Sequence, residues 1–304
     1  MRLFFFLFLC FTLSIQIPFA QTVALSSVPV PNYRTQRTDT SVPPSKEILT
    51  RIMTFNLRYD NSQDGENTWD KRKYELLKTI KAEQCDFYCF QEALYSQVNY
   101  LADSLGLDYT YYGKGRDDAK QGGEYSPIFF DKNRYILMNA HTYWLSSTPD
   151  TVSRGWDAAC NRIVTAVYFY DTKVDRYLTV FNTHFDHIGV VARKHSAEFI
   201  LSLLDRKPWI ESSQTIVCGD FNALSSDESI QLLQDRLTIA QEKNGQEMAT
   251  FNAFDTSRAP EKRIDFLLFA NFKKGTIHTM QTHRANGLWL SDHLPVVGIL
   301  EEEQ

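Results

Sequence analysis

Cysteine is scarce in this sequence, and the few cysteines are not arranged as metal ligands. The chain has 5 cysteines among 304 residues, and no cluster of cysteine and histidine has the spacing of a structural zinc site. Cys10 lies in the apolar segment at the start, which leaves Cys85, Cys89, Cys160 and Cys218. In an extended strand Cys85 and Cys89 would be about 13 Å apart, beyond the reach of a disulfide. We therefore expect the four to be buried free thiols.

The sequence also lacks an excess of positive charge. It has 32 Lys and Arg against 37 Asp and Glu, a formal net charge of −5, and no insertion rich in Lys or Arg. A protein that tracks the phosphates of a duplex usually carries clusters of basic residues. Nucleic acid is therefore disfavoured as a partner, although a local basic patch is compatible with this composition. No protein partner is predicted.

Long apolar runs are absent except in the first twenty residues. The run from Leu3 to Ile17 follows one basic residue and is followed by Ala20, the pattern of a secretory signal peptide over residues 1–20. Its fifteen residues are too few to span a bilayer comfortably, so we expect no stable membrane anchor. Residues 21–47, rich in Ser, Thr and Pro, predict a flexible linker. We expect an exported protein, periplasmic or secreted, with one folded domain over 48–304.

Alternating strand and helix patterns fill that domain, without an internal repeat. Apolar spacing of about 3.6 residues predicts helices at 70–83, 94–105 and 190–207. Apolar and β-branched runs predict strands at 51–58, 86–92, 125–131, 134–145, 162–170, 176–184, 215–221, 263–269, 276–283 and 293–300. Strands outnumber helices and include apparent hairpins. An α/β fold of two packed sheets with helices on the outer faces is therefore predicted.

Polar residues recur at the carboxyl ends that we assign to these strands. They are Asn56, Glu92, His184, Asp220, Asn222, Asp265, Asp292 and His293. One polar residue at a strand end is ordinary, because the chain leaves the core there, but eight beside six apolar segments predict a cluster on one rim of the core.

The residue types in this cluster indicate one chemistry. Carboxylate and amide oxygens are the ligands that Mg²⁺ or Mn²⁺ prefers, so Glu92 and Asp292 are predicted direct ligands, with Asn56 assisting through its amide oxygen or a bound water. Two histidines beside a hard cation suit proton transfer and charge stabilisation at a phosphoryl group. The combination predicts a metal-dependent phosphoester hydrolase.

The motifs TFNLR, QE, THFDH, GDFN, RIDFLL and SDHLPV, in this order, resemble the endonuclease/exonuclease/phosphatase superfamily over nearly all of residues 50–300. The resemblance implies a four-layer α/β/β/α sandwich, in which two mixed β-sheets pack face to face between outer helices. It also implies that Asp220 positions the attacking water, and that Asn222 binds a phosphate oxygen or orients that water.

Two histidine and carboxylate pairs are implied by the same resemblance. His293 would be the general base or an essential phosphate contact, with Asp265 holding its imidazole ring. His184 would stabilise charge on the phosphoryl group, supported by Glu124. A carboxylate beside an imidazole selects its tautomer and stabilises its charged form. For Glu124, a solvated loop acid is the alternative interpretation.

Substrate-binding candidates lie outside these motifs. In the segment RGWDAACNRIV, residues 154–164, Arg162 would clamp a phosphate and Trp156 would stack on a sugar or base. A buried tryptophan with a surface ion pair explains that segment equally well. Phe251 and Asn252 lie on a loop before Asp265 and would line the substrate pocket.

The sequence ranks the substrates without deciding among them. With its WDAA and TFN motifs, residues 156–159 and 250–252, the chain most resembles an exported bacterial branch close to some sugar-phosphate phosphatases. This resemblance makes a small phosphorylated sugar the first expectation. A phosphodiester in nucleic acid or a lipid headgroup is the second, and the absence of a long hydrophobic hairpin weakens the lipid. A catalytically inactive secreted binding module is the alternative of another class.

Overall fold

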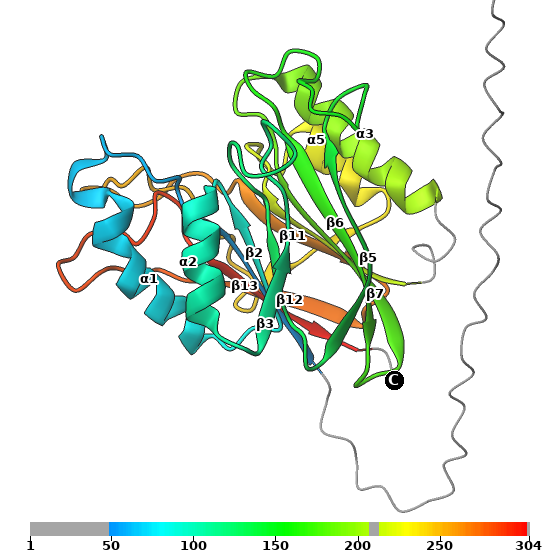
Figure 1. Cartoon of the computed structure of the whole chain (residues 1–304), viewed down its shortest axis with the longest axis horizontal. Helices are drawn as coiled ribbons and strands as arrows, with labels where there is room; N and C mark the ends of the chain where they lie inside the picture. Colours follow the sequence, from blue (N-terminus) through cyan, green and yellow to red (C-terminus); the bar gives the residue numbers. More distant parts are fainter. Residues whose placement is uncertain (1–48, 207–212, 303–304) are drawn as a thin grey trace, which may run out of the picture. The chain divides into compact units, whose positions relative to one another are not determined.

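The computed structural model describes residues 49–206 and 213–302, which form two β-sheets with flanking helices (Figure 1). The predicted signal peptide (1–20) and linker (21–47) lie outside the described residues and stay predictions. Within the described part of the chain, no helix combines the length and apolar character needed to cross a bilayer.

The first sheet has seven strands in the order β10-β12-β13-β1-β2-β4-β3. They are β1 (Leu49–Asn56), β2 (Phe87–Gln91), β3 (Tyr109–Tyr112), β4 (Ile128–Asp131), β10 (Gln241–Glu242), β12 (Lys274–Thr279) and β13 (Val296–Glu301). Strands β1 and β2 are parallel, and helix α1 (Trp69–Ala82) connects them. Strand β13 runs antiparallel to β1, and β4 runs antiparallel to β2.

The second sheet has six strands in the order β5-β6-β7-β8-β11-β9. They are β5 (Tyr135–Trp144), β6 (Ile163–Asp171), β7 (Arg176–His184), β8 (Gln214–Asp220), β9 (Thr238–Ile239) and β11 (Asp265–Ala270). Strands β7 and β8 are parallel, and α3 (Val190–Arg206) lies between them in the sequence. Strands β6 and β11 are antiparallel to their neighbours β7 and β8.

Strand alternation divides the apolar side chains into three layers of core. Ile52 packs between the two sheets, whereas its neighbour Met53 packs under α1 and α2 (Tyr95–Leu105). In the second sheet Ile216 faces the other sheet, and Val217 faces α3 and α5 (Glu228–Gln234). Successive residues of a strand point to opposite faces, so each sheet is covered on both sides. The predicted four-layer α/β/β/α sandwich is confirmed, with α1 and α2 on one outer face and α3 and α5 on the other (Figure 1).

The long elements match the predicted segments, whereas three short strands were not predicted. Strands β3, β9 and β10 contain only four, two and two residues, too few to show a period. The thiols Cys85, Cys89, Cys160 and Cys218 are all free, as expected. Cys160 is only half-buried, which corrects the expectation that all four are buried, because it lies on the loop before β6.

Candidate active site

The predicted site residues meet at one rim of the sandwich, but the strands reach this rim in both directions. Asn56, His184 and Asp220 end β1, β7 and β8, and Glu92 follows β2. Asp265 instead begins β11, and Asp292 and His293 precede β13.

The antiparallel pairing of strands explains this arrangement. Asp265 of β11 is the register partner of Asp220 at the end of β8, which is itself the partner of His184 on β7. The start of an antiparallel strand lies beside the end of its neighbour, so residues before and after strands meet at one edge. The expectation that all eight residues lie at carboxyl ends was therefore wrong for Asp265, Asp292 and His293, although the cluster that it predicted is present.

Unusual backbone conformations position two of these segments. Gly219 has φ of 147°, and a Cβ atom there would lie 1.9 Å from the carbonyl oxygen of Thr183, so only glycine allows β7 and β8 to approach at this point. Asn222 and Glu92 have φ of 47° and 60°. A left-handed conformation costs a non-glycine residue on the order of 1 kcal/mol, which the surrounding structure must offset.

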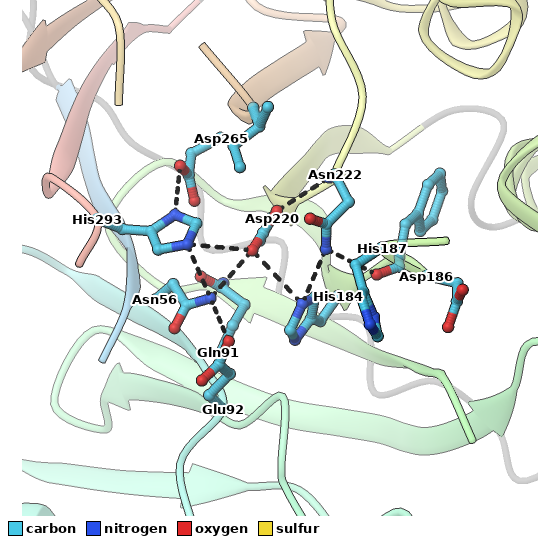
Figure 2. A network of polar contacts seen from close by, with 12 residues as sticks. Asn56, Gln91, Glu92, His184, Asp186, His187, Asp220, Asn222, Asp265 and His293 are labelled. Carbon is cyan, nitrogen blue, oxygen red and sulfur yellow. Dashed lines mark hydrogen bonds and ion pairs between the residues drawn. The ribbon is translucent and has the colours of Figure 1, made fainter. Parts of the chain in front are cut away.

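His293 is buried between two carboxylates (Figure 2). Its Nδ1 lies 2.9 Å from Asp265 Oδ2, and its Nε2 lies 3.6 Å from Asp220 Oδ2. Burial lowers the pKa of His293, but the charges of Asp265 and Asp220 outweigh it and raise this pKa well above the ordinary value of 6.5. The two carboxylates therefore favour the imidazolium form of His293.

His184 is buried on the other side of Asp220 and has the opposite proton affinity. Asn222 Nδ2 donates to the carbonyl oxygen of Phe185 at 3.1 Å and also lies 3.1 Å from His184 Nε2. Because a carbonyl oxygen only accepts, the atom of Asn222 that faces it must be the amide nitrogen. The same nitrogen donates to His184 Nε2, which is therefore an acceptor, and the ring proton of neutral His184 lies on Nδ1. Burial lowers the pKa of His184 well below 6.5, and the charges of Arg162 and Arg116 lower it further. His184 is therefore neutral.

Glu124 lies beside His184, but its direct partner is an arginine. Glu124 Oε2 accepts a hydrogen bond from Arg116 Nη1 at 2.7 Å and is 3.7 Å from His184 Nδ1. Burial raises the pKa of Glu124 to about 7, while the charge of Arg116 opposes this rise. The implied pair of Glu124 and His184 is thus adjacent without a hydrogen bond, and the solvated loop acid is excluded because the side chain is largely buried.

Glu92, Asp220 and His184 form a compact group of potential metal ligands. Each offers one ligand atom, and these atoms lie within 4.8 Å of one another. Asn56 Nδ2 donates to both Glu92 Oε1 and Asp220 Oδ2, each at 3.0 Å. Burial raises the pKa of Asp220 to about 7, although His293 opposes the shift. Two carboxylates held this close, of which Asp220 is buried, are a donor set that fits a hard divalent cation.

Two of the predicted metal residues are arranged differently from the expectation. Asn56 Oδ1 accepts the backbone N–H of Arg58 at 3.0 Å, so the amide turns its nitrogen to the acids and direct ligation by its oxygen does not fit this conformation. Asp292 lies outside the compact group, with Oδ2 3.9 Å from Arg58 Nη1. Burial raises the pKa of Asp292, and the charge of His293 opposes this rise. The charge of Glu92 adds to the rise, so Asp292 and Glu92 lie close enough to interact electrostatically.

The four predicted substrate-binding residues separate into two groups. Arg162 is buried and lines a small pocket, which we call the arginine pocket. This pocket is lined by Arg116, Glu124, Tyr125, Ser126, Arg162, Ile163 and His184. Trp156 is 42% exposed and stacks on His195 of α3, with ring centroids 4.6 Å apart. The alternative of a buried tryptophan is therefore wrong.

The loop before β11 carries the other two candidates. Phe251 packs edge-on against His293, with ring centroids 5.0 Å apart, and lines a second cavity of about 230 Å³. Asn252 Nδ2 donates to the carbonyl oxygen of Ser291 at 3.0 Å. Asn252 also lines that cavity, but its side-chain contact ties the loop to the segment that carries His293.

Three charged residues near the site were not singled out from the sequence. Arg58 has φ of 59° and binds Asp64 through two contacts of 3.0 Å beside Asp292. Arg116 lies in a glycine-containing loop, and Asp186 lies inside the THFDH motif. The signal available for Arg58 and Asp186 was a charge directly after an apolar strand, whereas nothing local distinguishes Arg116.

Comparisons with known proteins agree with this architecture. The model of the endonuclease/exonuclease/phosphatase family matches residues 53–293. The chain is 32% identical to an endonuclease/exonuclease/phosphatase from Bacteroides vulgatus, with a TM-score of 0.75, covering 84% of this chain and 100% of that one. It is 28% identical to a mannosyl-6-phosphatase of Bacteroides thetaiotaomicron, with a TM-score of 0.73, covering 83% and 99%.

A more distant structure shares the fold alone. The catalytic domain of human Nocturnin with bound sulfate is 20% identical, has a TM-score of 0.64, and the match covers 83% of this chain and 93% of that one. No curated protein sequence is significantly similar to the chain. The family match and the 32% identity together show that the chain belongs to the endonuclease/exonuclease/phosphatase family, whose members hydrolyse phosphoester bonds.

Proposed function

We propose that the protein is a divalent-metal-dependent phosphomonoesterase that acts on small sugar phosphates. The observation that carries this proposal is the buried row of His293, Asp220 and His184, in which two histidines with opposite proton affinities face one carboxylate. Neighbouring titratable groups whose pKa values are shifted in opposite directions are typical of a site that carries out acid and base catalysis. The similarity to a mannosyl-6-phosphatase supports the substrate class.

Glu92 and Asp220 would hold the cation, Mg²⁺ or Mn²⁺, with Asp292 nearby and Asn56 assisting through a bound water. A divalent cation bound there polarises a phosphoryl oxygen and offsets the negative charge of these acids. The acids fit this role because their desolvation raises the pKa of Asp220 and Asp292, a cost that a nearby positive charge relieves.

The other residues around this position would have separate roles in the reaction. Asp220 Oδ2 and His293 Nε2 lie 3.6 Å apart, and both would contact the attacking water from the same side. Asp265 holds the His293 ring through Nδ1, so Nε2 is the nitrogen that exchanges a proton with the reacting oxygens. His184 would donate its Nδ1–H to a phosphoryl oxygen, which stabilises the charge that develops there, and Asn222 would hold His184 in this tautomer through Nε2. To act as the base, His293 would have to be neutral, the form that the charges of Asp265 and Asp220 disfavour.

The test compares the wild type with His293→Ala, each with Mg²⁺ and with EDTA. The substrates are mannose 6-phosphate, glucose 6-phosphate, a bis-aryl phosphodiester and plasmid DNA. We expect turnover of a sugar phosphate by the wild type with Mg²⁺ and a loss of at least ~10² in rate for the variant. Preferred turnover of the diester or DNA would instead support the phosphodiesterase, and no turnover above the controls would support an inactive binding module.

We also propose that the protein is exported. The support is the signal-peptide pattern of residues 1–20, which lie outside the described residues. A reporter fused after residue 47 should reach the periplasm or the medium. Its retention in the cytoplasm would refute export.

A further inference from the structure

Three fully buried polar side chains lie between the apolar core and the site residues. They are Thr54 on β1, Gln91 on β2 and Asn182 on β7. Strand alternation gives them the same face as apolar residues two positions earlier, such as Cys89 and Val180, which pack between the two sheets. Polar groups buried there cost free energy unless hydrogen bonds satisfy them, so their hydrogen bonds identify what they hold together.

Asn182 binds the first sheet although it belongs to the second. Its Nδ2 donates to the carbonyl oxygens of Phe90 and Pro127, each at 2.8 Å. Because carbonyl oxygens only accept, this end of the amide is the nitrogen, and Oδ1 is left as an acceptor. Oδ1 accepts from Gln91 Nε2 at 2.6 Å. One side chain therefore joins β7 to β2 and to the residue that precedes β4.

The Gln91 amide is oriented by this hydrogen bond between the sheets. Besides Asn182 Oδ1, its Nε2 lies 3.1 Å from both Thr54 Oγ1 and the carbonyl oxygen of Cys89. Its Oε1 is buried and has no hydrogen-bond partner among the described residues. Turning the amide round would place Oε1 against Asn182 Oδ1 and the Cys89 carbonyl, which only accept. The Gln91 nitrogen is therefore fixed towards Asn182 even though the oxygen stays unpaired.

Gln91 and Asn182 adjoin the site from opposite sheets. Gln91 precedes Glu92, whose φ of 60° turns the chain at the end of β2. Asn182 lies two residues before His184, on the same face of β7. The ligand atoms of Glu92, from the first sheet, and of His184 and Asp220, from the second, lie within 4.8 Å of one another (Figure 2). The spacing of these atoms therefore depends on how the two sheets are held together beside them.

Hydrogen bonds fix that spacing more closely than apolar packing does. The hydrophobic effect is non-directional, whereas a hydrogen bond weakens steeply as its angle departs from linear. The ligands of a metal ion depend on such outer partners, whose loss typically lowers metal affinity or activity by about 10–100-fold.

We propose that Asn182 and Gln91 are positioning residues that hold Glu92 at the distance from Asp220 and His184 that a divalent cation requires. Asn182 acts on Glu92 through Gln91, and on His184 through the backbone of β7. The inference rests on the proposed function, because the cation belongs to that function.

The test uses the full chain and the variants Gln91→Met and Asn182→Leu, alone and combined. Both substitutions keep the approximate size of the side chain and remove the hydrogen bond between the two amides. Mg²⁺ binding is measured by calorimetry without substrate, which keeps the test independent of turnover. The free energy of unfolding is measured in urea without metal, and kcat and KM are measured on mannose 6-phosphate.

Two control variants separate positioning from stability. Thr54→Val removes one acceptor of Gln91 but leaves its hydrogen bond between the sheets. Arg134→Met breaks the buried ion pair with Asp171 and is not among the residues of the site. We expect Arg134→Met to lower the free energy of unfolding, and we expect neither control to change Mg²⁺ affinity.

We expect Gln91→Met and Asn182→Leu each to weaken Mg²⁺ binding at least about tenfold and to lower kcat, with KM changed less. The double variant should lose less stability than the sum of the two single variants, because neither amide is left facing a missing partner. Its Mg²⁺ binding should nevertheless stay weak. If Asn182→Leu does not fold, Gln91→Met decides, because it keeps the bonds of Asn182 to the two carbonyls.

Unchanged Mg²⁺ affinity in folded Gln91→Met, or an equal loss of affinity in either control, would overturn the inference while leaving the proposed function standing. A wild type that binds no divalent cation and hydrolyses no ester would refute the proposed function, and the inference with it.

Discussion

Replacement of Asp265 by asparagine tests the buried pair at the centre of the site. Asp265 Oδ2 lies 2.9 Å from His293 Nδ1, and neither residue is appreciably exposed. At this distance opposite unit charges attract by about 6 kcal/mol for an effective dielectric constant of about 20. Asp220, 3.6 Å from Nε2, contributes about 5 kcal/mol on the same scale. Asparagine therefore removes roughly half of the attraction that keeps the imidazolium charged.

Replacing Asp265 by asparagine also affects which nitrogen of the His293 ring carries the proton. An asparagine amide can accept from Nδ1–H or, rotated, donate to Nδ1, and the second orientation places the ring proton on the wrong nitrogen. Because the side chain keeps its size, the fold should be retained. We expect kcat to fall by ~10²–10⁴ with little change in KM, since Asp265 does not contact the substrate directly.

The assay is steady-state hydrolysis of a sugar phosphate with saturating Mg²⁺, and circular dichroism verifies the fold. Asp235→Asn, at an exposed residue directly after α5, provides the matched control and should keep wild-type activity. A folded Asp265→Asn variant that retains more than about a fifth of the wild-type kcat would refute a role for this pair, because loss of a positioned acid or base costs about a hundredfold or more.

Three further outcomes are expected. Glu92→Gln should raise the Mg²⁺ concentration for half-maximal activity at least about tenfold, and an unchanged requirement would exclude Glu92 as a ligand. Arg134→Met should lower the free energy of unfolding by about 3–5 kcal/mol in urea titrations, because it leaves Asp171, paired at 2.7 Å, buried without its partner. NMR of the metal-free protein at pH 7 should show His293 as the imidazolium and His184 as neutral. Two ordinary midpoints near 6.5 would contradict the assigned burial and contacts.

Much of the fold could be predicted because strand alternation and helical spacing are local properties of the chain. Ile52 and Met53 are adjacent apolar residues, and strand alternation sends one to the other sheet and one to the helices. Strand direction is not local. Asp265 and Asp220 each border an apolar run, and only their antiparallel pairing shows that one begins its strand and the other ends it.

The predictions of substrate-binding residues were less complete, because contacts between distant segments are also not local properties of the chain. The predicted phosphate contact of Arg162 rests on its residue type alone, whereas its partners Asp186 and His187 lie on the loop between β7 and α3. Arg116 lies about seventy residues before His184 and shares a pocket with it only after the two sheets pack. A pattern search along the chain cannot detect a donor that becomes unpaired through burial.

The sequence by itself determined the layers of the sandwich, the family and the residue types of the site. Apolar periodicity and the order of the motifs are properties of the linear sequence and need no knowledge of the tertiary structure. Only the tertiary structure shows that Asp220 lies in one compact group with Glu92, that Glu124 binds Arg116, and that the two histidines differ in proton affinity. Each of these depends on distance and desolvation among residues far apart in sequence, and such quantities exist only once the sheets have packed.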